Sequence, residues 1–68
     1  MIVLGLNYHH GDASACIVKD GQLLTAVEEE RFVGIKHSSD FPINSIKFCL
    51  SSNNLNPNDI DFIAVNKK

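Results

Sequence analysis

The sequence has 68 residues, 44% of them hydrophobic, and a formal net charge of −2 at pH 7. This composition is typical of a small globular protein, and without a basic stripe we expect neither a nucleic acid nor an anionic membrane as a partner. The apolar opening MIVLGL is too short for a signal peptide or a membrane-spanning helix. Cys16 and Cys49 lack CxxC partners, so we expect reduced thiols in a cytoplasmic protein, with a disulfide between them as the alternative.

Three strands are predicted in the first part of the chain. Residues 2–6 and 13–19 are apolar runs rich in β-branched side chains, which favour buried strands. Asp20-Gly21 separates the second run from a third at 22–27 and favours a type I′ turn, because both central residues need positive φ. We therefore expect 13–19 and 22–27 to pair antiparallel.

The second part of the chain is predicted to contain one helix and one strand. Residues 28–40, EEERFVGIKHSSD, have no clean period and are expected to form a strand end followed by an ordered loop. Pro42 suits the first position of a helix that ends at 51–54. The apolar stripe of this helix comprises Ile43, Ile46, Cys49 and Leu50. Asn56-Pro57-Asn58 predicts a turn before a last strand at 59–65.

The resulting β-β-β-α-β order indicates an α/β fold with a mixed sheet. A strand that follows a crossover helix normally returns parallel to its neighbour in the same sheet. Such a unit leaves one sheet face uncovered, so residues 1–68 are interpreted as an incomplete domain, the beginning of a larger one.

One cluster of titratable residues lies between the first two strands, in NYHHGDASAC. Small residues and exposed backbone N–H groups at Gly11 and Ser14 could hold a phosphate. His9 or His10 could act as a general base, with Asp12 orienting it. Two alternatives remain open, a capped turn with exposed histidines and the start of a metal site with too few ligands.

A second charged cluster follows the third strand. Three acids at 28–30 come directly after an apolar run, so at least one is expected to point inward. Arg31, Lys36 and His37 could bind phosphoryl or carboxylate oxygens. The alternative is a solvated strand end, as most charge runs are.

These segments together resemble a known family. The sequence LGLNYHHGDASAC, the run EEERF, the pair KH in IKH and the FP before the helix resemble the amino-terminal part of the O-carbamoyltransferases of nodulation-factor synthesis and antibiotic tailoring. The resemblance covers residues 2–50 and weakens towards 65. It implies the beginning of an actin-like ATPase domain, a ribonuclease-H-like fold similar to the ATPase subunit of tRNA threonylcarbamoylation.

The resemblance also implies an activity. Family members move a carbamoyl group from carbamoyl phosphate, through carbamoyl-adenylate, to a hydroxyl of a sugar or natural product, and they use ATP and a divalent metal. His10 would take the acceptor proton or hold the intermediate, and Lys36 would contact phosphate or the carbamoyl oxygen. Because Gly11 separates His10 from Asp12, His9 is the alternative equivalent of the family histidine. Asp12 and Ser14 would shape the hairpin, and Glu28–Glu30 with Arg31 would form a charged wall under it. The substrate- or phosphate-binding residues expected in total are His9, Gly11, Asp12, Ser14, Glu30, Arg31 and His37.

The metal ligands and most of the ATP site of the family correspond to sequence that is absent from this chain. We therefore expect the isolated chain to be inactive and to need the missing remainder of the domain. Two other readings stay open, a sugar-kinase-like ATPase fragment and a non-enzymatic remnant or interaction module. The Asp-x-Gly-x-(Ser/Thr) pattern of such kinases is absent after the first strand.

Overall fold

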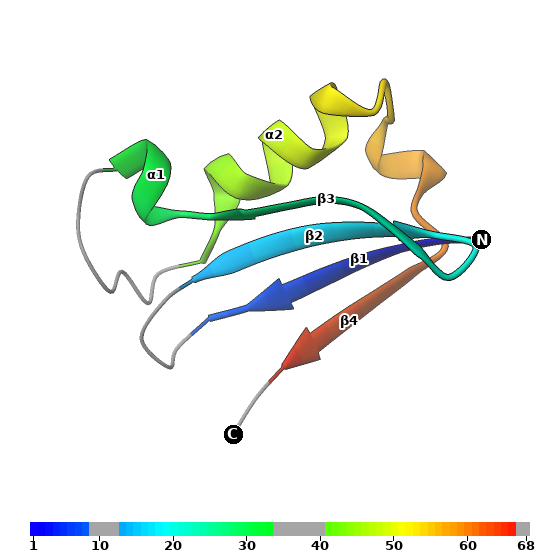
Figure 1. Cartoon of the computed structure of the whole chain (residues 1–68), viewed down its shortest axis with the longest axis horizontal. Helices are drawn as coiled ribbons and strands as arrows, with labels where there is room; N and C mark the ends of the chain where they lie inside the picture. The colour runs from blue at the N-terminus through cyan, green and yellow to red at the C-terminus, as the bar shows by residue number, and fades with distance from the viewer. Residues whose placement is uncertain (9–12, 34–40, 67–68) are drawn as a thin grey trace.

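The computed structural model describes residues 1–8, 13–33 and 41–66 (Figure 1). One helix lies along a four-stranded sheet, and a single helical turn follows the third strand. The elements in chain order are β1 (Ile2–Asn7), β2 (Ser14–Lys19), β3 (Gln22–Glu28), α1 (Glu30–Val33), α2 (Ile43–Ser52), the 3-10 helix η1 (Pro57–Asp59) and β4 (Phe62–Asn66).

The sheet has the order β3-β2-β1-β4 and is mixed. β1 and β3 pair antiparallel with β2, and β4 returns parallel to β1 after α2. Asp20 and Gly21 have φ values of 51° and 83°, which confirms the predicted turn with positive φ at both central residues. The predicted β-β-β-α-β order and mixed α/β sheet are therefore confirmed.

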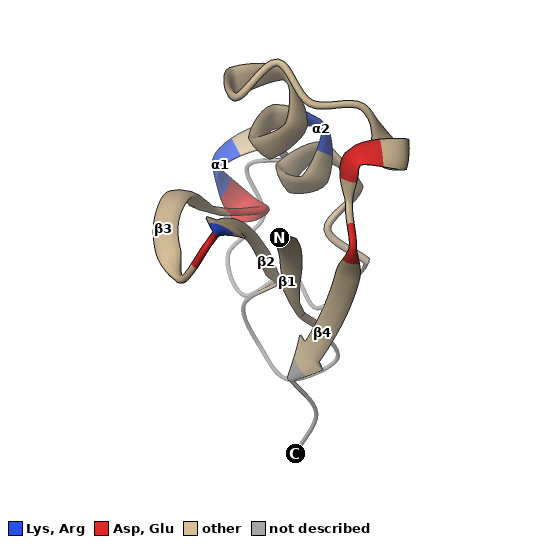
Figure 2. Ribbon diagram, turned by 90° about the vertical axis from the view of Figure 1, so that its right-hand side faces the viewer, with Lys and Arg blue, Asp and Glu red and all other residues tan. Residues whose placement is uncertain are grey.

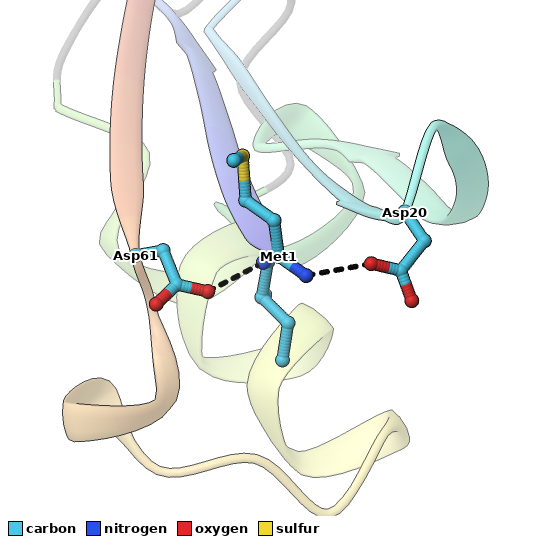
Figure 3. Close-up of polar contacts among 4 residues, drawn as sticks. Met1, Asp20 and Asp61 are labelled. Carbon is cyan, nitrogen blue, oxygen red and sulfur yellow. Dashed lines mark hydrogen bonds and ion pairs between the residues drawn. The ribbon is translucent and has the colours of Figure 1, made fainter.

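Polar contacts around the first residue join three segments at one end of the sheet (Figure 3). The Met1 amine lies 2.6 Å from Asp20 Oδ1, and this contact lowers the pKa of the Asp20 carboxyl. Ile2 N–H donates to Asp61 Oδ2 at 2.7 Å, while Asp61 N–H donates to the Ile2 carbonyl at 2.8 Å. The β2–β3 turn and the start of β4 are thereby fixed beside the start of β1.

The core lies between the sheet and α2, which packs on β2 and β3. Its buried members are Leu4, Leu6, Ala15, Ile17, Val27 and Cys49. Successive strand residues face opposite sides of a sheet, so Gly5, Cys16 and Ala26 face away from α2. β4 lies at the sheet edge, on the side of β1 away from β2 and β3 (Figure 1). Its Phe62 and Ile63 side chains are exposed. Among the described residues, no helix is long and apolar enough to cross a membrane.

The start of α2 differs from the prediction. Pro42 is the N-cap residue and not the first helical residue, and Ile43 is 47% exposed although it was assigned to the apolar stripe. The buried face is set by Ser45 and Cys49, one turn apart. Ile43 lies two residues before Ser45, roughly 200° around the helix, and therefore points away from the sheet.

Two other segments differ from the prediction by more than one residue. β3 ends at Glu28, as the predicted strand end does, but the loop expected after it begins with the helical turn α1. The last strand begins at Phe62 and not at residue 59. Asn56 N–H donates to Asp59 Oδ2 at 2.8 Å, and this local bond stabilises η1 in place of an extended chain.

Candidate functional site

Polar residues of all four strands form one row at an end of the sheet. Asn7 pairs with Ser14 across β1 and β2, and Ser14 pairs with Glu28 across β2 and β3. On the other side of β1, Asn7 pairs with Asn66. Since paired residues lie side by side, the row crosses the sheet at the carboxyl ends of β1 and β4.

An open hollow of about 1390 Å³ begins at this row. Glu28, Glu30 and Arg31 supply its charged end, and small residues such as Gly5 and Ala64 form its apolar part. Figure 2 shows charged residues on α1, whereas the β1 ribbon carries none. The full lining comprises Gly5, Leu6, Asn7, Ser14, Ala15, Cys16, Leu23, Ala26, Val27, Glu28, Glu30, Arg31, Ala64 and Val65.

Gly5 and Cys16 shape the apolar part of the hollow. The two residues are opposite each other in β1 and β2. A Cβ atom on Gly5 would stand 2.7 Å from Cys16 Sγ, so a larger residue would collide with the thiol. Both cysteines are free thiols; burial and the nearby Cys16 raise the pKa of Cys49, whose Sγ donates to the Ala15 carbonyl at 3.6 Å.

Glu29 behaves differently from the acids on either side of it. Its side chain is only 3% exposed, and Oε1 accepts hydrogen bonds from both the backbone N–H and the hydroxyl of Ser45 at 2.8 Å. Oε2 accepts from Asn44 Nδ2 at 2.8 Å and from the Asn44 N–H at 3.3 Å. Burial acts to raise the pKa of Glu29, but the bonds from Ser45 and Asn44 outweigh burial and lower it.

The Glu29 carboxylate therefore caps α2 from a distant part of the chain. Pro42, the N-cap residue, makes no side-chain cap bond. The first N–H groups of a helix need acceptors, and a negative charge there also interacts favourably with the helix dipole. One of the three acids thus points inward, as expected, and the alternation of Val27, Glu28 and Glu29 along the strand was the signal that could have identified which one.

Two described residues that flank the segments 9–12 and 34–40 lie in contact. Tyr8 and Phe41 are in edge-to-face contact, with ring centroids 5.3 Å apart and an interplanar angle of 71°. Ala13 accepts a hydrogen bond from Glu29 N–H at 2.8 Å. The residues that flank the two segments therefore meet at the same end of the sheet as the polar row.

The structure places part of the predicted site. Ser14, Glu30 and Arg31 all line the hollow. The remaining predicted residues, His9, His10, Gly11, Asp12, Lys36 and His37, lie outside the described residues. Asn7 belongs to the polar row and was missed, because a single Asn at a strand end carries no distinctive pattern. Within 1–8, 13–33 and 41–66, no three His, Cys, Asp or Glu residues gather as a metal-binding group.

Comparison with known proteins decides the family. The model of the family described as "Carbamoyltransferase N-terminus" matches residues 2–68. The chain belongs to this family.

Three relatives are similar in sequence to this chain over most of its length. The nodulation protein NolNO of Sinorhizobium fredii is 49% identical over 53 residues, which cover 78% of this chain and 8% of NolNO. An uncharacterised 19.2 kDa protein of Rhizobium etli is 50% identical over 56 residues, or 82% of this chain and 32% of that protein. An uncharacterised Synechocystis protein is 36% identical over 66 residues, which cover 97% of this chain and 11% of that protein. The chain thus spans between about a tenth and a third of the length of these relatives.

Proposed function

We propose that the chain is the amino-terminal portion of an ATP-dependent O-carbamoyltransferase. The complete enzyme would move a carbamoyl group from carbamoyl phosphate, through carbamoyl-adenylate, to a hydroxyl group of a sugar or natural product. The family match over residues 2–68 carries this proposal. A cytoplasmic location fits a reaction that uses ATP and carbamoyl phosphate.

The geometry supports a site at the polar end of the sheet. The contact between Tyr8 and Phe41 joins the flank of the segment that contains His10 to the flank of the segment that contains Lys36. Ser14 and Arg31 line the hollow at the same end. The hydroxyl and guanidinium groups are suited to oxygen atoms of a phosphate or carbamoyl group.

Each proposed residue has a defined role in the transfer step. The acceptor hydroxyl oxygen attacks the carbamoyl carbon, and the bond between that carbon and the leaving oxygen breaks. His10 takes the hydroxyl proton as this bond forms, since a neutral imidazole is a suitable base near pH 7. Lys36 neutralises charge on the phosphate or the carbamoyl oxygen, and Arg31 binds the donor.

The described residues do not by themselves fit the ATP phosphates. Glu28 and Glu30 bring two negative charges to the hollow against the single positive charge of Arg31. A triphosphate would be repelled there without further cations. We therefore propose that the ATP phosphates and the divalent metal bind to residues other than those at 1–8, 13–33 and 41–66.

The proposal is tested by joining this chain to the continuation of a family member with measured carbamoyl transfer, in place of its own matching segment. Transfer of labelled carbamoyl from carbamoyl phosphate is compared for His10→Asn, His9→Asn and Asp20→Asn. Loss of activity with His10→Asn alone is expected, while His9→Asn and the control Asp20→Asn, at the opposite end of the sheet, keep activity.

Other outcomes have distinct meanings. Loss with His9→Asn alone would move the family equivalence by one residue. Full activity in both histidine variants would refute the proposed catalytic histidine. A wild-type fusion that folds and shows no transfer would contradict the proposed function itself.

A further inference from the structure

Glu29 makes contacts in two directions. Its backbone N–H donates to the Ala13 carbonyl at 2.8 Å. Its carboxylate accepts from Ser45 and Asn44, with three of these four bonds at 2.8 Å. One buried residue at the end of β3 is therefore bonded both to the start of β2 and to the start of α2.

Both bonded partners flank segments that carry predicted site residues. Ala13 directly follows residues 9–12, and Asn44 comes shortly after residues 34–40. The neighbours Glu28 and Glu30 line the hollow. Glu29 thus connects the anchor points of both segments to the charged end of the hollow.

A helix cap alone does not require this arrangement. Ser, Thr, Asp or Asn at the N-cap position would satisfy the first N–H groups locally. Here Pro42 occupies that position, and the acceptor comes from a residue 15 positions before Asn44. A distant acceptor satisfies the same donors and in addition fixes the helix start relative to the end of β3.

A second polar contact fixes the opposite end of α2. Asn53 Nδ2 donates to Thr25 Oγ1 at 2.9 Å and to the Cys49 carbonyl at 2.7 Å. This contact also joins α2 to β3, but it lies away from Ala13, Tyr8 and the polar row. It provides a matched control, because its loss weakens the attachment of α2 without touching the two anchor points.

We propose that Glu29 is a positioning residue that holds the start of β2, at Ala13, in register with the start of α2, at Asn44 and Ser45. This inference rests on the proposed function in one respect, because the importance of the register depends on His10 and Lys36 acting together. In this role Glu29 touches no substrate and acts through Ala13, Asn44 and Ser45.

The first test uses the 68-residue chain and nuclear magnetic resonance. Glu29→Ala is expected to abolish the Tyr8–Phe41 ring contact and to speed amide hydrogen exchange at Ser45 by about tenfold or more, because a charged acceptor is lost. Thr25→Val removes the opposite contact and is expected to leave both readouts as in the wild type. Retention of the ring contact and of Ser45 protection in Glu29→Ala would overturn the proposal.

A conservative variant keeps the test decisive if Glu29→Ala does not fold. Glu29→Gln retains one carbonyl oxygen for Ser45 and replaces the acceptor for Asn44 with a donor. The ring resonances of Tyr8 and Phe41 are then expected to move away from their wild-type values. Unchanged resonances in Glu29→Gln would refute the proposal equally.

The second test uses the fusion enzyme described above. Glu29→Gln is expected to lower kcat with little change in KM, whereas Thr25→Val at comparable stability keeps the wild-type kcat. Equal kcat in both variants and the wild type would overturn the positioning role. An inactive wild-type fusion would count against the proposed function alone, since the resonance experiment on the 68-residue chain still decides the role of Glu29.

Discussion

Replacement of Gly5 by alanine tests how closely β1 and β2 pack against each other on the sheet face away from α2. The added Cβ would lie 2.7 Å from Cys16 Sγ, whereas ordinary carbon contacts are about 3.5–4.0 Å. Overpacking of this kind costs about 1–3 kcal/mol. Alanine recovers about 0.5–1 kcal/mol of the entropy that glycine loses in a strand. The net expected loss in the free energy of unfolding for Gly5→Ala is therefore about 0–2.5 kcal/mol.

The cause of this loss is identified by a double-mutant cycle. Urea unfolding followed by circular dichroism would be measured for Gly5→Ala, Cys16→Ala and the double variant. Because Cys16→Ala removes the Sγ atom, Gly5→Ala in that background is expected to be neutral or stabilising. Cys49→Ala is the control, since Cys49 packs on the opposite face and its effect should add to that of Gly5→Ala. An equal cost of Gly5→Ala with and without Cys16 would refute the argument.

Two further predictions concern acid stability and self-association. The folded pKa of Glu29 lies below its ordinary value of 4.5, so its contribution to stability is present above about pH 4.5 and is lost as the pH falls through the folded value. Urea unfolding at decreasing pH should therefore show a smaller acid-induced loss for Glu29→Gln than for the wild type, and parallel losses would contradict the assignment. Phe62 and Ile63 are 59% and 63% exposed on an edge strand, so the chain should self-associate with rising concentration in sedimentation experiments, and Ile63→Lys should reduce this. A wild-type chain that stays monomeric at all concentrations would contradict this prediction.

Local sequence chemistry was sufficient for most of the elements. The Asp20-Gly21 turn was predictable because few dipeptides adopt positive φ at both positions without strain. The strands were predictable because their apolar runs are short and bounded by turn residues. Boundaries were less certain where side chains compete with the backbone, as at Asp59, whose carboxylate stabilises η1.

The helix face shows where local reasoning failed. Ile43 was assigned to the core by its spacing, but a polar residue, Ser45, occupies the buried face. Ser45 is tolerated there because its N–H and hydroxyl both donate to Glu29. A pairing across 16 residues has no periodic signature in a single sequence, so the hydrophobic pattern alone gave the wrong orientation for the first turn of α2.

For this protein, the sequence by itself determined the strands, the hairpin turn, the helix and the family, because each depends on neighbouring residues or on a specific run of them. Only the tertiary structure decided that Asn7, Ser14 and Glu28 form one row, since strand register depends on contacts between distant segments. It also decided which groups bind the inward-pointing acid of EEERF. Glu28 and Glu30 line the hollow, whereas Glu29 is buried because the unsatisfied N–H groups at the start of α2 stabilise its charge.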